Sequence, residues 1–250
     1  MKITNQWNLF LKSFTLKPVF FFIIAYDLIF YAIITPCILI YKNIQLKKAA
    51  ALRIANLETY VATASPAEMQ ALIQSMKSFI YFTIIGAILL LLIALFSYSF
   101  SRTLIWNYLL KKKFNTKKFL KFNLLNLFLG LFTLFLLSIL LVFIRISLPI
   151  FITLFYFILV AIFLFIFLLY MNYINIGKIF KSLALTVEKF NKKIGIAYLF
   201  SIAVFAVILL LMFLLNLIIR TPYASTVTSL ALLIIFTAWM RLYILSAVKE

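Results

Sequence analysis

The sequence contains no histidine, a single cysteine at Cys37 and only five acidic residues among 250. Histidine is the commonest metal ligand and general base, and one cysteine cannot form an intrachain disulfide or a cysteine-cluster metal site. Only four glycines occur, and none belongs to a glycine-rich phosphate-binding loop. Serine–histidine pairs, paired intramembrane carboxylates and metal cages are therefore excluded within a bilayer, so we predict no enzymatic activity, no metal and no cofactor.

Apolar residues, by contrast, are abundant. Hydrophobic residues make up 67% of the chain and charged residues 12%, whereas soluble domains have about 45–50% and about 25%. Such a chain cannot cover its apolar surface with polar groups, so lipid is its expected solvent. The net charge of +19 is not read as nucleic-acid binding, because Lys and Arg lie in short segments between apolar runs, where lipid headgroups are expected.

Six apolar runs are each long enough to cross a bilayer as a helix. They cover residues 18–41, 78–100, 119–144, 148–171, 194–219 and 223–247. The sequence thus predicts an all-α, polytopic integral membrane protein with a single membrane domain over residues 1–250 and six transmembrane helices arranged as three helical hairpins. Lys113-Phe114-Asn115 precedes the third run much as Lys189-Phe190-Asn191 precedes the fifth. Either an internal duplication or the sheer abundance of these residue types accounts for the likeness.

The segments outside the runs are of three kinds. Residues 1–17 form a basic amphipathic lead-in expected at the membrane interface. Residues 42–77 are predicted to form an outer helical hairpin, in which Ser65-Pro66-Ala67-Glu68 signals the start of a helix that continues into the second run. The segments 101–118 and 172–193 are basic with apolar residues at helical spacing, which predicts amphipathic helices on the cytoplasmic membrane surface.

The distribution of Lys and Arg predicts the orientation. With six crossings both termini lie on one side, together with 101–118 and 172–193, and this side holds most of the Lys and Arg. An excess of these residues marks the cytoplasmic side, so we predict a multi-pass protein of the cell membrane with both termini in the cytoplasm. The three tryptophans would then lie near the cytoplasmic headgroups, as aromatic belts do.

Asp27 is the one acidic residue inside a predicted crossing. A carboxylate costs a few kcal/mol there, so it should face the bundle interior and have a partner. Arg241 lies at a similar depth in the last crossing, and we predict an Asp27–Arg241 contact that ties the first and last helices together. Two other interpretations stay open, namely that Asp27 carries a proton or binds a substrate, and that it reaches the interface with no special role.

The remaining cations are interpreted as anchors. Arg145 and Arg220 occupy equivalent outer turns, where they anchor to headgroups or, less simply, bind an anionic ligand at the mouth of the bundle. The residues expected to contact lipid headgroups are Trp7, Arg102, Trp106, Lys111, Lys112, Lys113, Lys117, Lys118, Lys178, Lys181, Lys189, Lys192, Lys193 and Trp239. Polar side chains within the runs, such as Asn126 and Asn216, are expected to bond between helices.

Two functions remain. The first is a non-catalytic membrane protein that binds anionic phospholipid, a partner membrane protein or both through the basic cytoplasmic helices. The second is a transporter for a small solute, with Asp27 coupling protons. Glycine or proline interruptions at mid-membrane usually mark a transport site, and here they are few, with Gly86 and Gly130 as exceptions. A water-accessible path to Asp27 favours transport, and a tightly packed bundle favours the first function.

Overall fold

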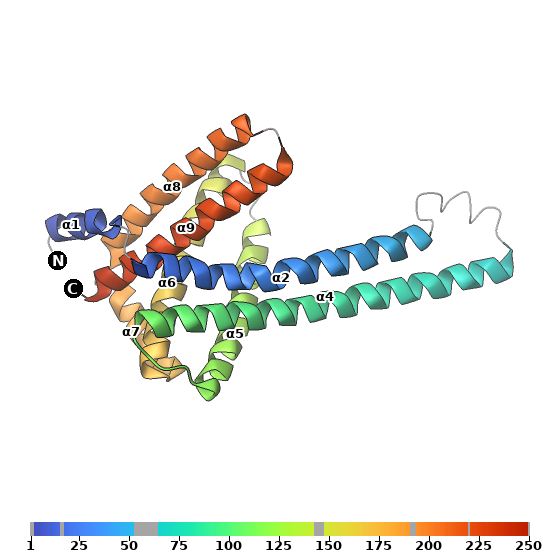
Figure 1. The fold of residues 1–250 in the computed structure, drawn as a ribbon, viewed down its shortest axis with the longest axis horizontal. Helices are drawn as coiled ribbons and strands as arrows, with labels where there is room; N and C mark the ends of the chain where they lie inside the picture. Colours follow the sequence, from blue (N-terminus) through green and yellow to red (C-terminus); the bar gives the residue numbers. More distant parts are fainter. Residues whose placement is uncertain are drawn as a thin grey trace. The chain divides into compact units, whose positions relative to one another are not determined.

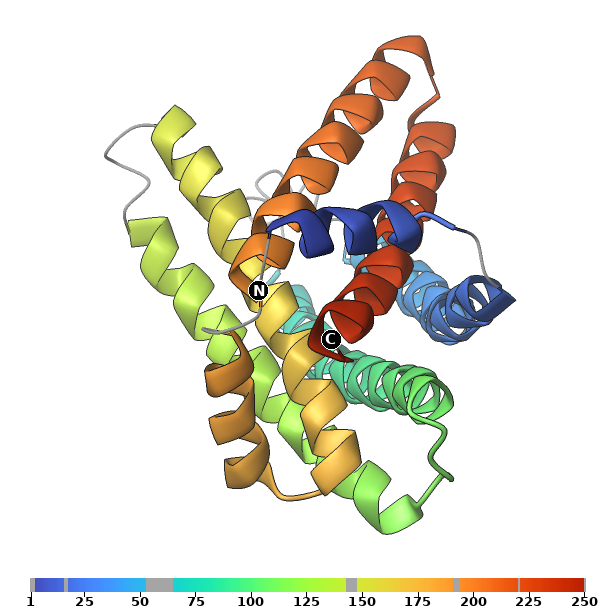
Figure 2. The same cartoon turned by 90° about the vertical axis from the view of Figure 1, so that its left-hand side faces the viewer.

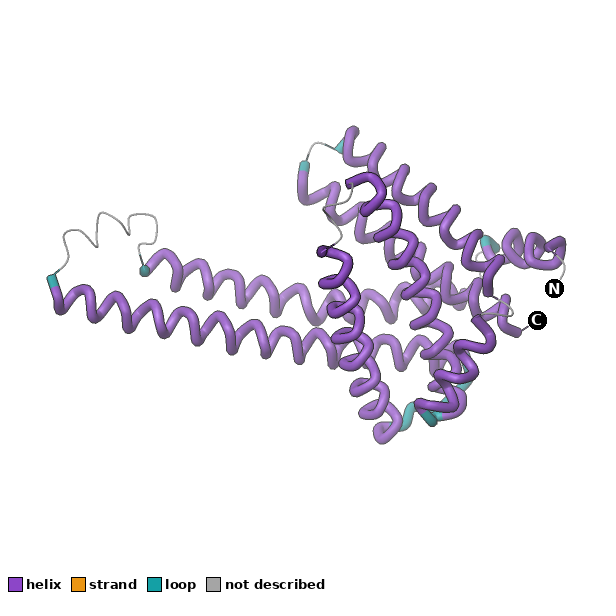
Figure 3. The backbone as a smooth tube through the Cα atoms, turned by 180° about the vertical axis from the view of Figure 1, so that it is seen from behind, coloured by secondary structure: helices purple, strands orange, loops and turns teal. Residues whose placement is uncertain are grey.

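The computed structural model describes residues 3–15, 18–52, 65–142, 148–190, 194–219 and 221–249. Within these ranges every regular element is a helix, as predicted, and there is no strand (Figure 3). Helices satisfy all their interior backbone hydrogen bonds within one segment, which is what a chain solvated by lipid requires.

Six helices of the described ranges are long and apolar enough to cross a membrane. They are α2 (Pro18–Ala51), α4 (Pro66–Leu109), α5 (Thr116–Val142), α6 (Leu148–Ile176), α8 (Gly195–Ile218) and α9 (Pro222–Lys249). Two shorter helices are α1 (Ile3–Ser13) and α7 (Ile179–Lys189). Five of the six predicted crossings lie inside a single helix, with at most one residue beyond its ends. The third predicted crossing, 119–144, lies in α5 up to Val142, and residues 143–147 are outside the described residues. Proline opens α2, α4 and α9, where its missing N–H has no intrahelical partner to lose.

The start of α4 has the capping box that the sequence predicts. The Ser65 backbone N–H donates to Glu68 Oε2 at 2.7 Å, and the Glu68 N–H donates back to Ser65 Oγ at 3.4 Å. From this cap α4 runs unbroken for 44 residues, a length of about 66 Å. The predicted continuity between the polar segment and the second crossing is therefore confirmed.

The other end of α4 differs from the prediction. Residues 101–109 were expected to leave the helix and lie flat on the lipid surface, but they continue α4 to Leu109. No glycine or proline interrupts this stretch, and α4 ends only where Lys111 adopts a left-handed φ of 53°. The Lys112 N–H then donates to Asn107 O at 2.8 Å and the Lys111 N–H to Tyr108 O at 3.2 Å, a Schellman cap.

The contacts divide the chain into two compact units, and each is described by itself. The first unit comprises residues 1–27 and 102–250, and the second comprises residues 28–101. The predictions of one membrane domain and of three hairpins are not tested by this division and stay predictions.

The first unit is built around α6 and the C-terminal half of α9. Their buried side chains include Leu164, Phe167 and Tyr173 from α6 and Met240 and Tyr243 from α9. Helix α1 lies across α8 and α9 (Figure 2). There Trp239 Nε1 donates to Ser13 Oγ at 2.8 Å, and the Phe10 ring stacks on Phe200 with centroids 4.7 Å apart.

Polar contacts between helices of the first unit are those expected for lipid-embedded segments. The buried Tyr170 hydroxyl of α6 donates to Asn126 Oδ1 of α5, and the Ser225 hydroxyl of α9 donates to Asn216 Oδ1 of α8. Both asparagines therefore bond to a neighbouring helix as predicted.

The second unit consists of the parts of α2 and α4 that fall within residues 28–101, and they run side by side (Figure 1). The Tyr41 hydroxyl donates to the Thr83 carbonyl at 2.9 Å, and the Tyr41 ring stacks on Phe82 with centroids 5.8 Å apart. A Cβ atom on Gly86 would overlap the Tyr41 ring. Glycine at this position therefore lets the two helices approach closely.

Candidate functional site

Asp27 occupies a buried ion cluster that joins three helices of the first unit. Its side chain is 1% exposed and accepts from two guanidinium groups. Arg241 Nη1 of α9 donates to Oδ2 at 2.6 Å, and Arg102 Nη1 of α4 donates to Oδ1. The Asp27–Arg241 contact that the sequence predicts is present, and Arg102 is a second, unpredicted partner.

A fourth helix supports the same cluster through an aromatic ring. The Arg241 guanidinium carbon lies 5.0 Å from the centroid of Phe167 of α6, a cation–π contact. Phe167 in turn contacts Trp106 of α4, with ring centroids 6.4 Å apart. Guanidinium is weakly hydrated and stacks on aromatic faces, which makes Arg better suited than Lys to such a dry site.

The geometry indicates what the cluster can do chemically. Both carboxylate oxygens of Asp27 accept hydrogen bonds from Arg, and the side chain has almost no exposed surface. Removing one member of a buried ion pair costs about 3–5 kcal/mol, so these contacts stabilise the packing of the helices that carry them.

Three residues expected at the lipid headgroups have buried side chains instead. Arg102 is 6% exposed, Trp106 0% and Trp239 5%. For Arg102 and Trp106 the reason is the continuation of α4, which carries them against Asp27 and Phe167 rather than onto the membrane surface. Trp239 is covered by Phe14, which directly follows α1 and whose ring stacks on it with centroids 5.2 Å apart. Trp7, by contrast, is 48% exposed, so about half of its surface remains accessible.

The sequence around Arg102 carries a signal for its buried position. Small polar residues precede and follow it, at Ser97, Ser99, Ser101 and Thr103, and all four are buried. Small hydroxyl side chains let helix backbones approach closely within a membrane. An arginine inside such a stretch is better interpreted as facing the bundle than the headgroups.

A basic surface lies where α4 meets α5 and where α6 meets α7. Its exposed lysines are Lys111, Lys112, Lys113, Lys117, Lys178 and Lys181, and we call these six residues the basic rim. The Lys118 ammonium donates to the Ile174 carbonyl at the end of α6, which brings the two junctions together. Exposed aromatic rings accompany the lysines, with Phe114 46% and Phe180 87% exposed.

Two predicted headgroup lysines point inward. Lys118 is partly buried at the α6 terminus, where a cation is favoured by the helix dipole. Lys189 Nζ donates to Asn172 Oδ1 at 3.3 Å, and Asn172 Nδ2 donates to Thr186 Oγ1 at 3.0 Å. These contacts hold α7 against α6.

Four predicted residues, Arg145, Lys192, Lys193 and Arg220, lie outside the described residues. Among the residues that the structure does describe, no three Cys, Asp or Glu side chains come together as metal ligands. No protein-family model, curated protein or solved structure matches this chain.

Proposed function

We propose that this chain is a non-catalytic integral membrane protein that binds anionic phospholipid headgroups through the basic rim. In this proposal the rim faces the cytoplasm, both termini lie on that side, and the crossings form three hairpins. The α1 and α7 helices lie at the membrane interface. The observation that carries the proposal is the gathering of six exposed lysines at two adjacent helix junctions.

Charge and exposed aromatic rings favour lipid as the ligand. Of the described acidic residues of the first unit, Asp27 is buried between two arginines and Glu188 is the one at the surface. Each cation near an anionic membrane surface contributes about 1 kcal/mol of attraction. Phe180, beside Lys181 and almost fully exposed, is the kind of amphipathic contact that enters the headgroup region.

A lipid-selectivity measurement tests the proposal. The protein is reconstituted in phosphatidylcholine, and the preference of its boundary for spin-labelled phosphatidylglycerol over phosphatidylcholine is measured. We expect a preference for phosphatidylglycerol that decreases in high salt and decreases severalfold in K113Q/K117Q/K181Q. The matched control, K42Q/K47Q/K77Q, removes the same charge from exposed positions outside the rim. Equal effects of the two triple variants would remove the rim from the proposal.

The orientation is tested separately with impermeant thiol reagents. After Cys37 is replaced by alanine, K112C should be labelled only in permeabilised cells, whereas Q70C should also be labelled in intact cells. Labelling of K112C from outside would contradict the proposed orientation.

The closed environment of Asp27 weighs against the transporter alternative, for which the same protein provides a test. Solute or proton flux is measured in proteoliposomes of the wild type and of Asp27→Asn. A flux that is lost in Asp27→Asn, while the variant stays folded, would favour transport over the lipid-binding proposal.

A further inference from the structure

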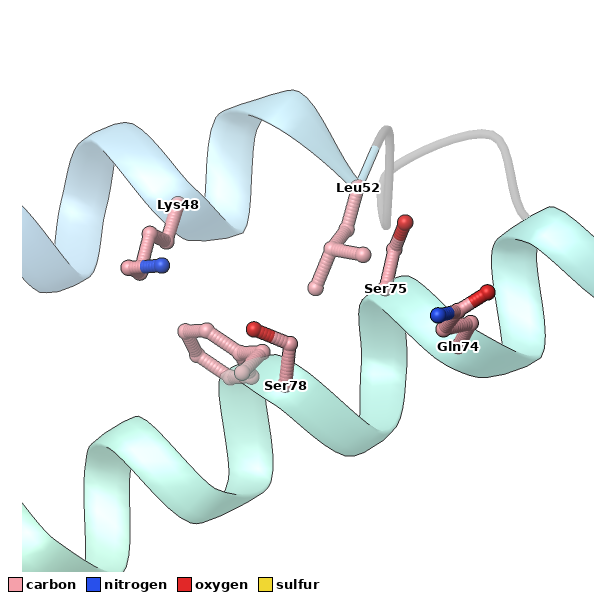
Figure 4. Close-up of a pocket in the computed structure, with 6 residues that line it drawn as sticks. Lys48, Leu52, Gln74, Ser75 and Ser78 are labelled. Atoms are coloured by element: carbon pink, nitrogen blue, oxygen red, sulfur yellow. The ribbon is translucent and has the colours of Figure 1, made fainter.

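The second unit contains a polar pocket that plays no part in the function proposed above. It has a volume of about 400 Å³ and lies between the ends of α2 and α4 (Figure 4). The lining residues are Lys48, Leu52, Gln74, Ser75, Ser78 and Phe79. None of these six residues is acidic.

The two helices supply complementary parts of the pocket. Lys48 lies in the last turn of α2 and Leu52 directly follows the end of this helix, and both side chains reach toward α4, as Figure 4 shows. Ser75 and Ser78 are three residues apart on α4, and residues at this spacing share a helix face. One cation and three neutral hydrogen-bonding side chains therefore line the pocket together with two apolar side chains.

The position of the Lys48 ammonium is defined by an aromatic ring. Its Nζ lies 5.1 Å from the centroid of Phe82. A cation–π contact uses the charge without occupying an acceptor, so the three ammonium donors remain suited to an anion. Serine hydroxyls and a glutamine amide are further donors, and a phosphate diester offers acceptors with a single negative charge.

The surrounding charge also favours an anion. Lys42 and Lys77 lie on the same two helix segments. The acid that the structure describes on these segments is Glu68, whose carboxylate already accepts from Ser65 in the capping box. The pocket thus lies in a region of net positive charge.

The depth of the pocket in the predicted crossings points to a lipid rather than a dissolved ligand. Ser78 begins the second predicted crossing, and Lys48 lies seven residues past the end of the first, about 10 Å along the helix. Headgroups occupy roughly the outer 5–8 Å on each side of the hydrocarbon core. The Lys48 ammonium reaches back into this layer, because it lies over the ring of Phe82, inside the second predicted crossing. We propose that this pocket binds the phosphate of an anionic phospholipid headgroup in the outer leaflet, with Leu52 and Phe79 contacting the glycerol and upper acyl region.

Native mass spectrometry of the detergent-purified full chain tests the proposal. Retention of phosphatidylglycerol is compared between wild type and K48Q, with K47Q as the matched control, because Lys47 is the exposed neighbour that does not line the pocket. The comparison is repeated in the K113Q/K117Q/K181Q background, so that lipid held at the basic rim does not mask the result. In this background the pocket proposal can fail while the basic-rim proposal holds, and the reverse.

We expect apparent affinity for one phosphatidylglycerol to fall roughly fivefold in K48Q and to stay unchanged in K47Q. The hydroxyl variant S75A/S78A, whose positions are exposed and tolerate alanine in a helix, should also lose retention while remaining monodisperse. Equal losses in K48Q and K47Q would overturn the site. Displacement of the lipid by millimolar inorganic phosphate would overturn the assignment to a lipid headgroup.

Discussion

Asp27 and Arg241 are 214 residues apart in the sequence, and their side chains meet at 2.6 Å. The first and last of the six helices that are long and apolar enough to cross a membrane are thereby joined through one carboxylate, which also accepts from Arg102. Two arginines share one acid in a buried environment, so the three positions are not equivalent. Removing the acid leaves two buried cations, whereas removing one arginine leaves a balanced pair.

This inequality predicts the effects of single substitutions in the cluster. Asp27→Asn should destabilise the folded protein by about 3–5 kcal/mol, because an uncompensated buried charge remains. Arg102→Met should cost less, about 1.5–3 kcal/mol, which is the range for one hydrogen bond to a charged group. Thermal unfolding in detergent measures both.

The apolar triple variant D27L/R102M/R241M serves as the control for this ranking. Replacing a whole buried ionic cluster by apolar residues is often neutral, so it should recover much of the stability lost in Asp27→Asn. An Arg102→Met variant as unstable as Asp27→Asn would contradict the ranking.

The contact between Arg241 and Phe167 predicts energetic coupling. In a double-mutant cycle of Arg241→Met and Phe167→Leu, we expect a coupling energy of about 0.5–2 kcal/mol, because the ring faces a desolvated guanidinium. Unfolding of the two single variants and the double variant measures this coupling. The control is Phe165→Leu, whose ring contacts Phe190 instead. Coupling of the same size with Phe165 would show that the Phe167 contact is not specific.

The close approach at Gly86 predicts that a methyl group is harmful there. Gly86→Ala should push the Tyr41 ring away and cost the Tyr41–Thr83 hydrogen bond, worth about 1 kcal/mol. Gly130 is the matched control, because a Cβ atom there meets nothing within 4 Å.

Alanine is favoured over glycine in a helix by up to about 1 kcal/mol, so Gly130→Ala should be neutral or stabilising. Thermal unfolding in detergent measures the change in stability of both variants. A stabilising Gly86→Ala would mean that the Tyr41 contact contributes little.

The capping box at the start of α4 predicts a local effect. Ser65→Ala removes the hydroxyl that accepts the Glu68 N–H and should cost about 1 kcal/mol. Hydrogen exchange should speed up in the first turn of α4 and stay unchanged near Phe82. Gln70→Ala, an exposed change within the same helix, should leave exchange in the first turn unaffected, and equal acceleration in both variants would argue against the cap.

Features set by local chemistry were predictable from the sequence. Apolar runs of bilayer length identified six crossing helices, and Pro18, Pro66 and Pro222 identified where three of them begin. Asp27 could be given a partner, because a carboxylate in lipid requires one and Arg241 lies at a matching depth. The end of α4 could not be predicted, because neither glycine nor proline marks it and Lys111 adopts its left-handed conformation within the cap.

By itself, the sequence determined that this chain is helical and solvated by lipid. It has too few polar residues to cover its apolar surface in water, and a helix forms its backbone hydrogen bonds within one segment. Only the tertiary structure decided that Arg102 is the second partner of Asp27 and that Trp106 and Trp239 belong to the interior. Composition and spacing describe one helix at a time, and they do not specify which helix faces meet. That choice depends on how side chains from distant segments fit together and on which buried charges can be paired.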